Sequence, residues 1–157
     1  MHDLEVDSTT VEAIIVASRT LVAIAARSLV GVDSEVTLGQ YRALVFVATR
    51  RQVNLVDLAN DLRVHPASAT RMCDRLVEKG LIERNGNPGD RRQHIISLSK
   101  AGSELVAKVT QIRRDEVNRI ISRMPADICD MLTRSLRAFS EAADESIDGE
   151  RFVLWPF

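Results

Sequence analysis

Apolar residues recur at the three- and four-residue spacing of helices over most of the chain, and a short interval in its middle alternates in the manner of strands. The spacing predicts six helices over residues 9–31, 38–50, 55–62, 66–80, 101–124 and 126–147. It predicts two short strands over residues 81–84 and 93–98. A chain of 157 residues with 45% hydrophobic residues is long and apolar enough for one domain with a real core.

Residues that favour helix N-termini stand at several of these boundaries. Thr9 with Glu12 and Thr37 with Gln40 have the spacing of a capping box, in which two side chains satisfy two free backbone N–H groups. Asn54 is placed to cap the helix over residues 55–62. We therefore expect helices to begin at these three places.

The helices over residues 55–62 and 66–80 form a helix-turn-helix. Pro66 suits the first position of the second helix, and Gly80 suits its end. Small or apolar residues share the inward face of that helix: Ala69, Cys73, Leu76 and Gly80. The outward face carries Ala67, Ser68, Thr70, Arg71, Asp74, Arg75 and Glu78. Short side chains followed by arginines are typical of a recognition helix that enters the major groove of DNA.

The two strands form a hairpin whose tip, residues 85–89, is dense in turn-forming residues. Arg91 and Arg92 stand at this tip and have the reach to enter a narrow minor groove, where the negative potential is strong. Asp90 is placed to orient one guanidinium through a charge-assisted hydrogen bond. We expect a wing that holds these three residues against DNA.

The formal net charge of −1 does not by itself suggest a nucleic-acid partner, but the charge is unevenly distributed along the chain. Between Leu62 and Arg92, seven cations stand against four anions, which leaves +3. Phosphate binding depends on where the charge lies. The predicted helix-turn-helix and wing are therefore basic, and the rest of the chain is acidic.

The run ATRMCDRLVEKGLIER over residues 69–84, then Asp90-Arg91-Arg92, then Leu98-Ser99-Lys100-Ala101-Gly102, resembles the MarR family of transcription regulators. In that family the wing carries an Asp-x-Arg pair, supplied here by Asp90 and Arg92, and its last strand ends in Leu-Thr, where this chain has Leu98-Ser99. The resemblance covers the whole helix-turn-helix and wing. On either side the order of helices fits, by pattern more than by residue.

The resemblance implies a role for each matching residue. Arg92 would enter the minor groove with Asp90 as its positioning partner, and Arg75 would touch phosphate. The residues that would read bases are Ser68, Thr70 and Arg71. Many members of the family respond to a small aromatic or anionic effector bound beside the DNA-binding part, which implies a ligand-responsive protein.

Four further residues are candidates for binding. His65, in the turn before Pro66, and Arg84 are candidate phosphate contacts, with His65 favoured as a turn or capping residue. Tyr41 and Phe46 are candidates for an effector pocket, although packing in the core is the better interpretation of both. The three histidines are far apart and no catalytic constellation is visible, so we expect no metal, no cofactor and no enzyme.

The flanking helices carry more apolar residues than one helix face can hold. The first has Ile14, Ile15, Leu21, Val22, Ile24, Ala25 and Leu29, and the last has Ile128, Met131, Leu132, Leu136 and Phe139. A shared interface between two copies would bury both sets. We expect a homodimer that places two recognition helices on the half-sites of a palindromic operator.

The fold class is therefore mainly α with a small β-hairpin wing, a winged helix-turn-helix between dimerisation helices. We divide the chain into an N-terminal dimerisation helix (1–34), a winged helix-turn-helix (35–99), C-terminal dimerisation helices (100–147) and an apolar tail (148–157). The apolar stretch over residues 11–30 is interrupted by Glu12, Arg19 and Arg27, so we interpret it as a helix buried against protein, not a membrane span. Cytoplasmic location fits two cysteines without framework spacing.

We predict a homodimeric DNA-binding transcription regulator, a repressor released by a small ligand. The alternative is a winged-helix module that uses the outward face of the second helix to bind another protein. For single residues, the alternatives are an exposed ion-pair ladder of Arg71 and Arg75 with Asp74 and Glu78, and a solvated loop around Arg91 and Arg92. The convergence of four arginines on one side of the head favours DNA.

Two features stay open at this point. Cys73 is either a small core residue, which its spacing favours, or a redox sensor. The tail Phe152-Val153-Leu154-Trp155-Pro156-Phe157 holds three of the six aromatic residues. Our hypothesis is that it docks in an apolar groove, and the alternative is a frayed terminus.

Overall fold

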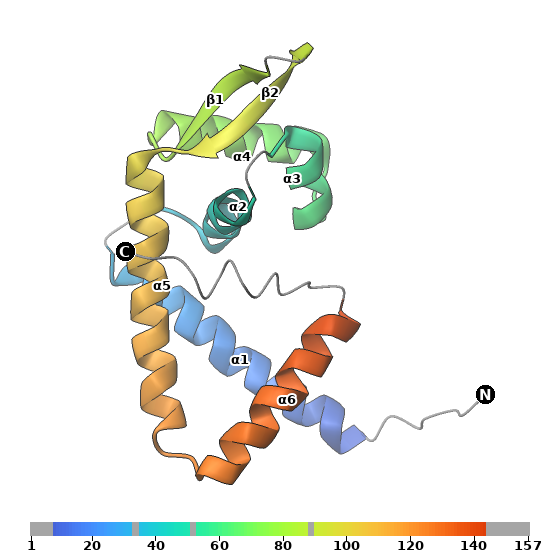
Figure 1. The fold of residues 1–157 in the computed structure, drawn as a ribbon, viewed down its shortest axis with the longest axis vertical. Coiled ribbons are helices and arrows are strands. Elements are labelled where there is room, and N and C mark those ends of the chain that lie inside the picture. Colours follow the sequence, from blue (N-terminus) through green and yellow to red (C-terminus); the bar gives the residue numbers. More distant parts are fainter. Residues whose placement is uncertain (1–7, 33–34, 51–52, 88–89, 144–157) are drawn as a thin grey trace, which may run out of the picture.

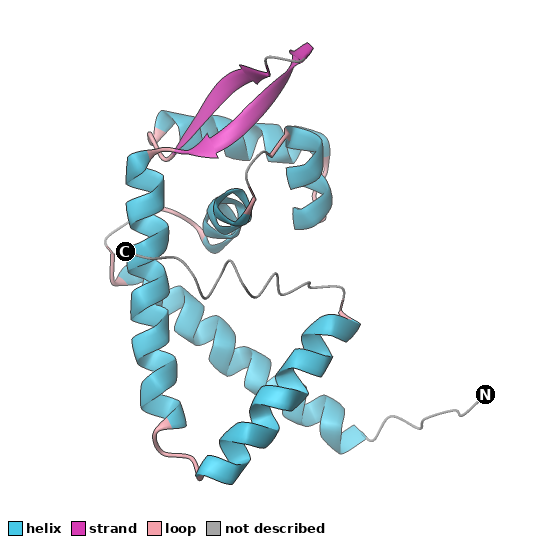
Figure 2. Ribbon diagram, in the orientation of Figure 1, coloured by secondary structure: helices cyan, strands magenta, loops and turns pink. Residues whose placement is uncertain are grey.

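The computed structural model describes residues 8–32, 35–50, 53–87 and 90–143 and confirms the predicted fold, mainly α with one hairpin (Figures 1 and 2). The elements are α1 (Ser8–Val30), α2 (Leu38–Thr49), α3 (Leu55–Leu62), α4 (Pro66–Glu78), β1 (Ile82–Asn87), β2 (Asp90–Leu98), α5 (Lys100–Ile121) and α6 (Ala126–Ala142). We call residues 35–99 the head, and α1, the distal part of α5 and α6 the helical layer.

The head is built around a hydrophobic core that Leu29 of α1 and Val106 and Val109 of α5 help to close. The largest fully buried apolar side chains come from α2, the segment before α3, α3, α4, β2 and the first turns of α5: Leu44, Val53, Leu58, Cys73, Leu76, Ile96 and Val109. Of the inward face predicted for α4, Ala69, Cys73 and Leu76 are fully buried, as expected, whereas Gly80 lies beyond the end of the helix and is exposed. Each buried leucine contributes about 1.5–3 kcal/mol relative to an exposed one.

The caps in the head follow the sequence prediction. Gln40 N donates to Thr37 Oγ1 (3.2 Å) and Thr37 N donates to Gln40 Oε1 (3.1 Å), so the capping box of α2 is confirmed. Asp57 N donates to Asn54 Oδ1 (2.9 Å) at the start of α3. These bonds satisfy N–H groups that the helices themselves cannot.

The ends of α3 and α4 depend on left-handed backbone. Gly80 adopts φ +67° just after α4, as expected of a glycine that ends a helix. Arg63 ends α3 at φ 52°, the one non-glycine residue with positive φ in the described part of the chain. A side chain at such a position is strained, so the turn between α3 and α4 is held by the packing of both helices.

The hairpin is longer than predicted. β1 pairs with β2 in antiparallel register from Ile82 opposite Leu98 to Gly86 opposite His94, and the register shifts between Gly86 and Asn87. Residues 85–87 and 90–92, expected in the turn, therefore belong to the strands. Val53, just before α3, adds an isolated bridge to Ile96, whose N donates to Val53 O (2.7 Å).

A tight junction sets the direction of α5. Ser99 caps α5 by accepting from Gly102 N (3.0 Å), and its Oγ donates to Gly80 O (2.6 Å). A Cβ atom at Gly102 would lie 2.0 Å from Leu81 O, so only glycine fits there. The motif 98–102 thus joins the base of the hairpin to the helical layer.

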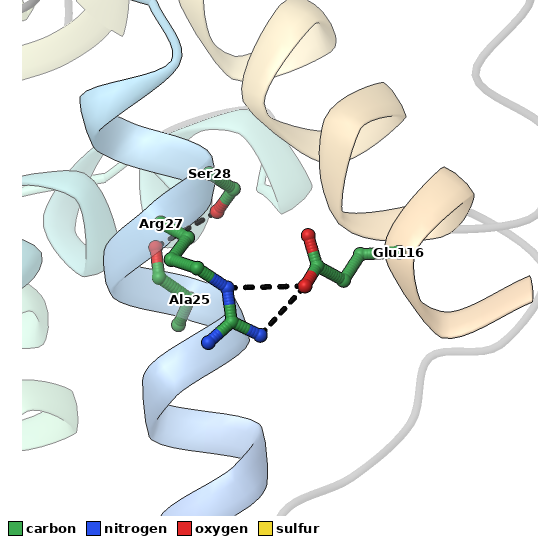
Figure 3. Close-up of polar contacts among 4 residues, drawn as sticks. All are labelled: Ala25, Arg27, Ser28 and Glu116. Carbon is green, nitrogen blue, oxygen red and sulfur yellow. Dashed lines mark hydrogen bonds and ion pairs between the residues drawn. The ribbon is translucent and has the colours of Figure 1, made fainter. Parts of the chain in front are cut away.

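In the helical layer, α1 packs on α5 (Figure 1). Arg27 Nε and Nη2 donate to Glu116 Oε1 at 3.0 and 2.6 Å (Figure 3). Within α1, Ile24, Ser28 and Leu29 are buried, and Ser28 Oγ donates to Ala25 O (2.8 Å), as Figure 3 also shows. The contact with α5 therefore involves only the last turns of α1.

The rest of this layer exposes apolar side chains. In α1, Val22 is 56% exposed, and α6 has no buried residue, with Phe139 52% exposed. By length and composition α1 is apolar enough to cross a bilayer. Within one chain, the prediction that α1 is buried against protein holds only for its last turns.

Several helix ends differ from the sequence prediction. Thr9 is the second residue of α1, so the prediction that it caps this helix is wrong: the helical backbone already includes Ser8. α5 ends at Ile121, earlier than the predicted residue 124. α6 begins after Pro125, as predicted, and ends at Ala142, earlier than the predicted residue 147. Residues 144–157, including the apolar tail, lie outside the described residues.

Candidate nucleic-acid interface

α4 lies beside the hairpin (Figure 1). Pro66 takes the first position of the helix, as predicted. Arg71, Asp74 and Arg75 are exposed, whereas Ser68 and Thr70 are half-buried. The helix can therefore offer two guanidinium groups and, nearer its N-terminus, two hydroxyl groups.

Both hydroxyl groups already have partners. Thr70 Oγ1 donates to Pro66 O (3.0 Å), and Ser68 Oγ accepts from Arg71 Nη2 (3.1 Å). The second bond draws the Arg71 side chain toward the N-terminal end of α4. A base edge would compete with one neutral hydrogen bond, at Thr70, which stabilises by about 1 kcal/mol, and with one from a guanidinium, at Ser68, which stabilises by about 1.5–3 kcal/mol.

Arg84 bridges the hairpin and α4. Its Nη2 donates to Asp74 Oδ1 (2.8 Å) and to Thr70 O (3.4 Å), and its side chain is 27% exposed. Asp74 therefore pairs with Arg84 on β1, and among the described residues no ion pair ties Arg71 or Arg75 into the ladder considered above. Arg84 orients the wing against α4, while its predicted contact with phosphate remains untested.

Cys73 lies under this bridge and is fully buried. Burial raises the pKa of its thiol, and the Arg84 guanidinium lowers that pKa by less. A thiol held in its protonated form inside the core is a poor nucleophile. Core packing, the favoured interpretation of Cys73, is confirmed.

His65 is the N-cap of α4. Its Nδ1 accepts from Ala67 N (3.2 Å), which confirms the predicted capping role. In the neutral ring with Nδ1 as acceptor, Nε2 carries the proton. The exposed Nε2–H is then free to donate outward, toward a phosphate of a bound duplex.

Asp90, Arg91 and Arg92 are the first residues of β2. Asp90 lies opposite Asn87, and Arg91 and Arg92 fall in the register irregularity between that pair and the pair of Gly86 with His94. Their side chains lie outside what the structure describes. The position of the three residues, at the end of the hairpin farthest from α5, is that of a wing tip (Figure 1).

Tyr41 and Phe46 both belong to the core, as favoured above. Tyr41 Oη and Thr110 Oγ1 share a hydrogen bond (3.2 Å), and the guanidinium groups of Arg113 and Arg50 lie 5.2 and 4.5 Å from the ring centres of Tyr41 and Phe46. A role for either residue in binding an effector stays a prediction. In the part of the chain that the structure describes, no three side chains are grouped as a metal site would need.

Two contacts that hold α4 and the hairpin in place were not predicted from the sequence. Lys79 Nζ donates to Glu35 O (2.7 Å), which ties the end of α4 to the segment before α2, and the Val53 bridge anchors β2. Both join residues more than 40 positions apart. Local spacing carries no signal for such contacts.

The comparisons with known proteins agree with this geometry. The model of the MarR family matches residues 36–94. An uncharacterized HTH-type transcriptional regulator of Mycobacterium leprae, ML2140, is 32% identical over 114 residues, which are 73% of this chain and 80% of that protein. The multiple antibiotic resistance protein MarR of Escherichia coli is 28% identical over 89 residues, 57% of this chain and 62% of that protein.

Solved structures share the whole arrangement. The crystal structure of RV1404 from Mycobacterium tuberculosis has a TM-score of 0.82 and 40% identity, covering 89% of this chain and 95% of that one. A mutant MarR from E. coli in complex with operator DNA has a TM-score of 0.67 at 23% identity, covering 88% and 99%, which supports the fold alone. The predicted winged helix-turn-helix fold is confirmed.

Proposed function

The chain belongs to the MarR family of DNA-binding transcriptional regulators, and from this premise we propose that it is a homodimeric repressor of a palindromic operator. The observation that carries the proposal is the pairing of an exposed, arginine-bearing α4 with a wing over a closed core. A rigid core is what lets a recognition helix hold one orientation in the major groove.

Within α4, the N-terminal half reads bases and the middle grips the backbone. Arg71, drawn toward Ser68, serves as the specific contact to guanine, with Ser68 and Thr70 beside it. Arg75, one turn further on, contacts phosphate, and so does the outward Nε2–H of His65.

The wing supplies the minor-groove contact. Arg92 enters the groove, Asp90 orients its guanidinium, and Arg91 adds positive charge at the tip. The Arg84–Asp74 bridge supports this role because it fixes the angle between the hairpin and α4. α4 in the major groove and the wing in the minor groove are then held at a fixed distance from each other.

The helical layer supplies the dimer. A second copy covers the apolar side chains that α1 and α6 expose. A dimer interface explains the exposed residues of α1 better than a membrane span does, because α1 packs on α5 and only a short segment separates it from α2 of the head. The division into head, dimerisation helices and tail is our proposal on the same ground. Location in the cytoplasm follows from a DNA target.

A small aromatic or anionic effector alters the distance between the two heads. Such a ligand acts only if it binds one head spacing more tightly than the other. α5 runs from the head to the far end of the helical layer, so a shift of α5 moves both (Figure 1).

Selection of bound sequences from random duplex DNA, followed by titration of the selected duplex at several salt concentrations, tests the proposal. We expect a palindrome with half-sites about one helical turn apart and a steep salt dependence of affinity. Recovery of no motif, with weak binding even at low salt, would instead support a winged-helix module that binds protein.

A further inference from the structure

The turn between α3 and α4 holds an arginine where the backbone favours glycine. Arg63 ends α3 with φ 52° and ψ 44°, in the left-handed region. Helices often end with a residue in this conformation, but that residue is usually glycine, because a Cβ atom comes too close to the following carbonyl oxygen. Gly80 ends α4 with positive φ and without that strain. The chain therefore keeps a strained residue at one of two comparable helix ends.

The turn itself does not use the arginine side chain. It is closed by two backbone bonds, from Arg63 N to Asn60 O (3.1 Å) and from Val64 N to Ala59 O (3.0 Å). Glycine at position 63 would form the same bonds. The Arg63 side chain is exposed, and within the described part of the chain it makes no ion pair and no hydrogen bond. Strained residues of this kind cluster at functional sites, so the side chain needs a use outside the fold.

The place of Arg63 in the head indicates what its side chain contacts. Arg63 stands two residues before His65, the N-cap of α4, so it lies at the N-terminal end of that helix. A helix-turn-helix places the N-terminal residues of its second helix at the base edges, whereas its first helix crosses the sugar-phosphate backbone. The turn between the two helices therefore faces the backbone at the edge of the major groove.

We propose that Arg63 binds a phosphate of the operator backbone, beside the contact proposed for His65. This contact rests on the proposed function and adds to it a residue and the reason for the strained turn. The guanidinium is always charged, and its N–H donors can bind two phosphate oxygens at once. Asp61, two residues earlier, forms no ion pair with Arg63 among the described residues, so the charge is available to DNA.

The contact adds affinity and no sequence preference. A phosphate carries no information about the base, so Arg63 strengthens binding to every duplex by the same factor and steepens its salt dependence. At position 63 the needs of the fold and of DNA binding are then opposed. Glycine is better for the turn, and arginine is better for binding.

Three substitutions in the full chain separate the backbone of residue 63 from its side chain. Arg63→Gly removes both the strain and the guanidinium, Arg63→Ala removes the guanidinium alone, and Arg63→Lys keeps a positive charge. Each variant is melted, and each is titrated at several salt concentrations with the duplex that the wild-type protein selects. Lys108→Ala, which removes an exposed cation of α5, is the matched control.

We expect Arg63→Gly and Arg63→Ala to bind roughly tenfold more weakly than the wild type, with a salt slope lower by about one for each bound subunit. Arg63→Lys should keep the wild-type slope, and Lys108→Ala should bind and melt as the wild type does. Arg63→Gly should melt no lower than the wild type and higher than Arg63→Ala, because glycine adopts a positive φ without strain.

Wild-type affinity and slope in Arg63→Ala would overturn the phosphate contact and leave the proposed function standing. So would a slope in Arg63→Lys as low as that in Arg63→Ala, or a changed base preference in any of the three variants. A melting temperature of Arg63→Gly below that of the wild type would assign the side chain to the fold and overturn the contact as well. Failure of the wild-type protein to select any duplex would overturn both proposals.

Discussion

The head and the helical layer differ in how completely one chain buries its apolar residues. In the head, Leu44, Leu58 and Leu76 are fully buried, whereas α6 has no buried residue and α1 exposes Val22 and its neighbours. Both regions are built from equally regular helices. The core of the head is closed within one chain, with Leu29 of α1 and Val109 of α5 completing it, while the helical layer keeps apolar surface that the proposed second copy would cover.

The largest effect is expected where a charge enters that uncovered surface. Leu136→Glu on α6 places a carboxylate in the proposed dimer contact and should weaken association by about 3–5 kcal/mol, more than a hundredfold. Sedimentation equilibrium measures it. Arg134→Glu, on the opposite face of the same helix, is the control and should stay dimeric; equal dissociation of both variants would contradict the assigned interface.

A cavity in the core of the head tests how completely one chain buries that core. Leu58→Ala removes a fully buried side chain of α3 and should lower the free energy of unfolding by about 2–5 kcal/mol. Chemical denaturation measures this loss. An effect below about 1 kcal/mol would mean that the core of the head is not closed in one chain.

DNA contacts should divide into two kinds. Arg92→Ala should lower operator affinity by about 1–3 kcal/mol, and Arg71→Ala should lower it and also change the preferred base. Titration against a set of single-base operator variants separates the two. If the Arg71 variant lost affinity without any change in base preference, Arg71 would not be a base-reading residue.

Arg84 and Arg75 should differ in their salt dependence. Arg84→Met breaks the bridge to Asp74 and should cost about 1 kcal/mol of operator affinity without changing the slope of affinity against salt. Arg75→Met removes the proposed phosphate contact and should reduce that slope by about one. A reduced slope in the Arg84 variant would restore its predicted role as a phosphate contact.

The smallest effect separates the two cysteines. Cys73 is buried with a raised thiol pKa, whereas Cys129 is half-buried, so alkylation of the native protein at neutral pH should modify Cys129 first. Mass spectrometry after timed quenching follows both. Equal rates would mean that α4 opens readily or that Cys73 is a reactive thiol after all.

Local pattern predicted most of the head. The capping box at Thr37, the cap at Asn54 and Pro66 at the start of α4 act within one helical turn, so the sequence alone places them. Pairing across the hairpin was underestimated, since the same residues that favour turns also extended the strands to Asn87 and Asp90.

Contacts between distant residues were not predictable in this way. The bridge from Arg84 to Asp74, the Val53 strand contact and the stacking of Arg113 on Tyr41 arise only when the helices have packed. Arg84 is an example. Its sequence position suggested a phosphate contact, as for any exposed arginine, whereas its ion pair with Asp74 in the folded chain indicates that it positions the hairpin against α4.

Binding of the wild-type protein and of Leu136→Glu to a full palindromic operator and to a single half-site tests whether the helical layer couples two heads. We expect both proteins to bind the half-site with equal affinity and the wild type to bind the full operator at least a hundredfold more tightly. Equal affinity for the full operator, or loss of half-site binding in Leu136→Glu, would contradict this coupling.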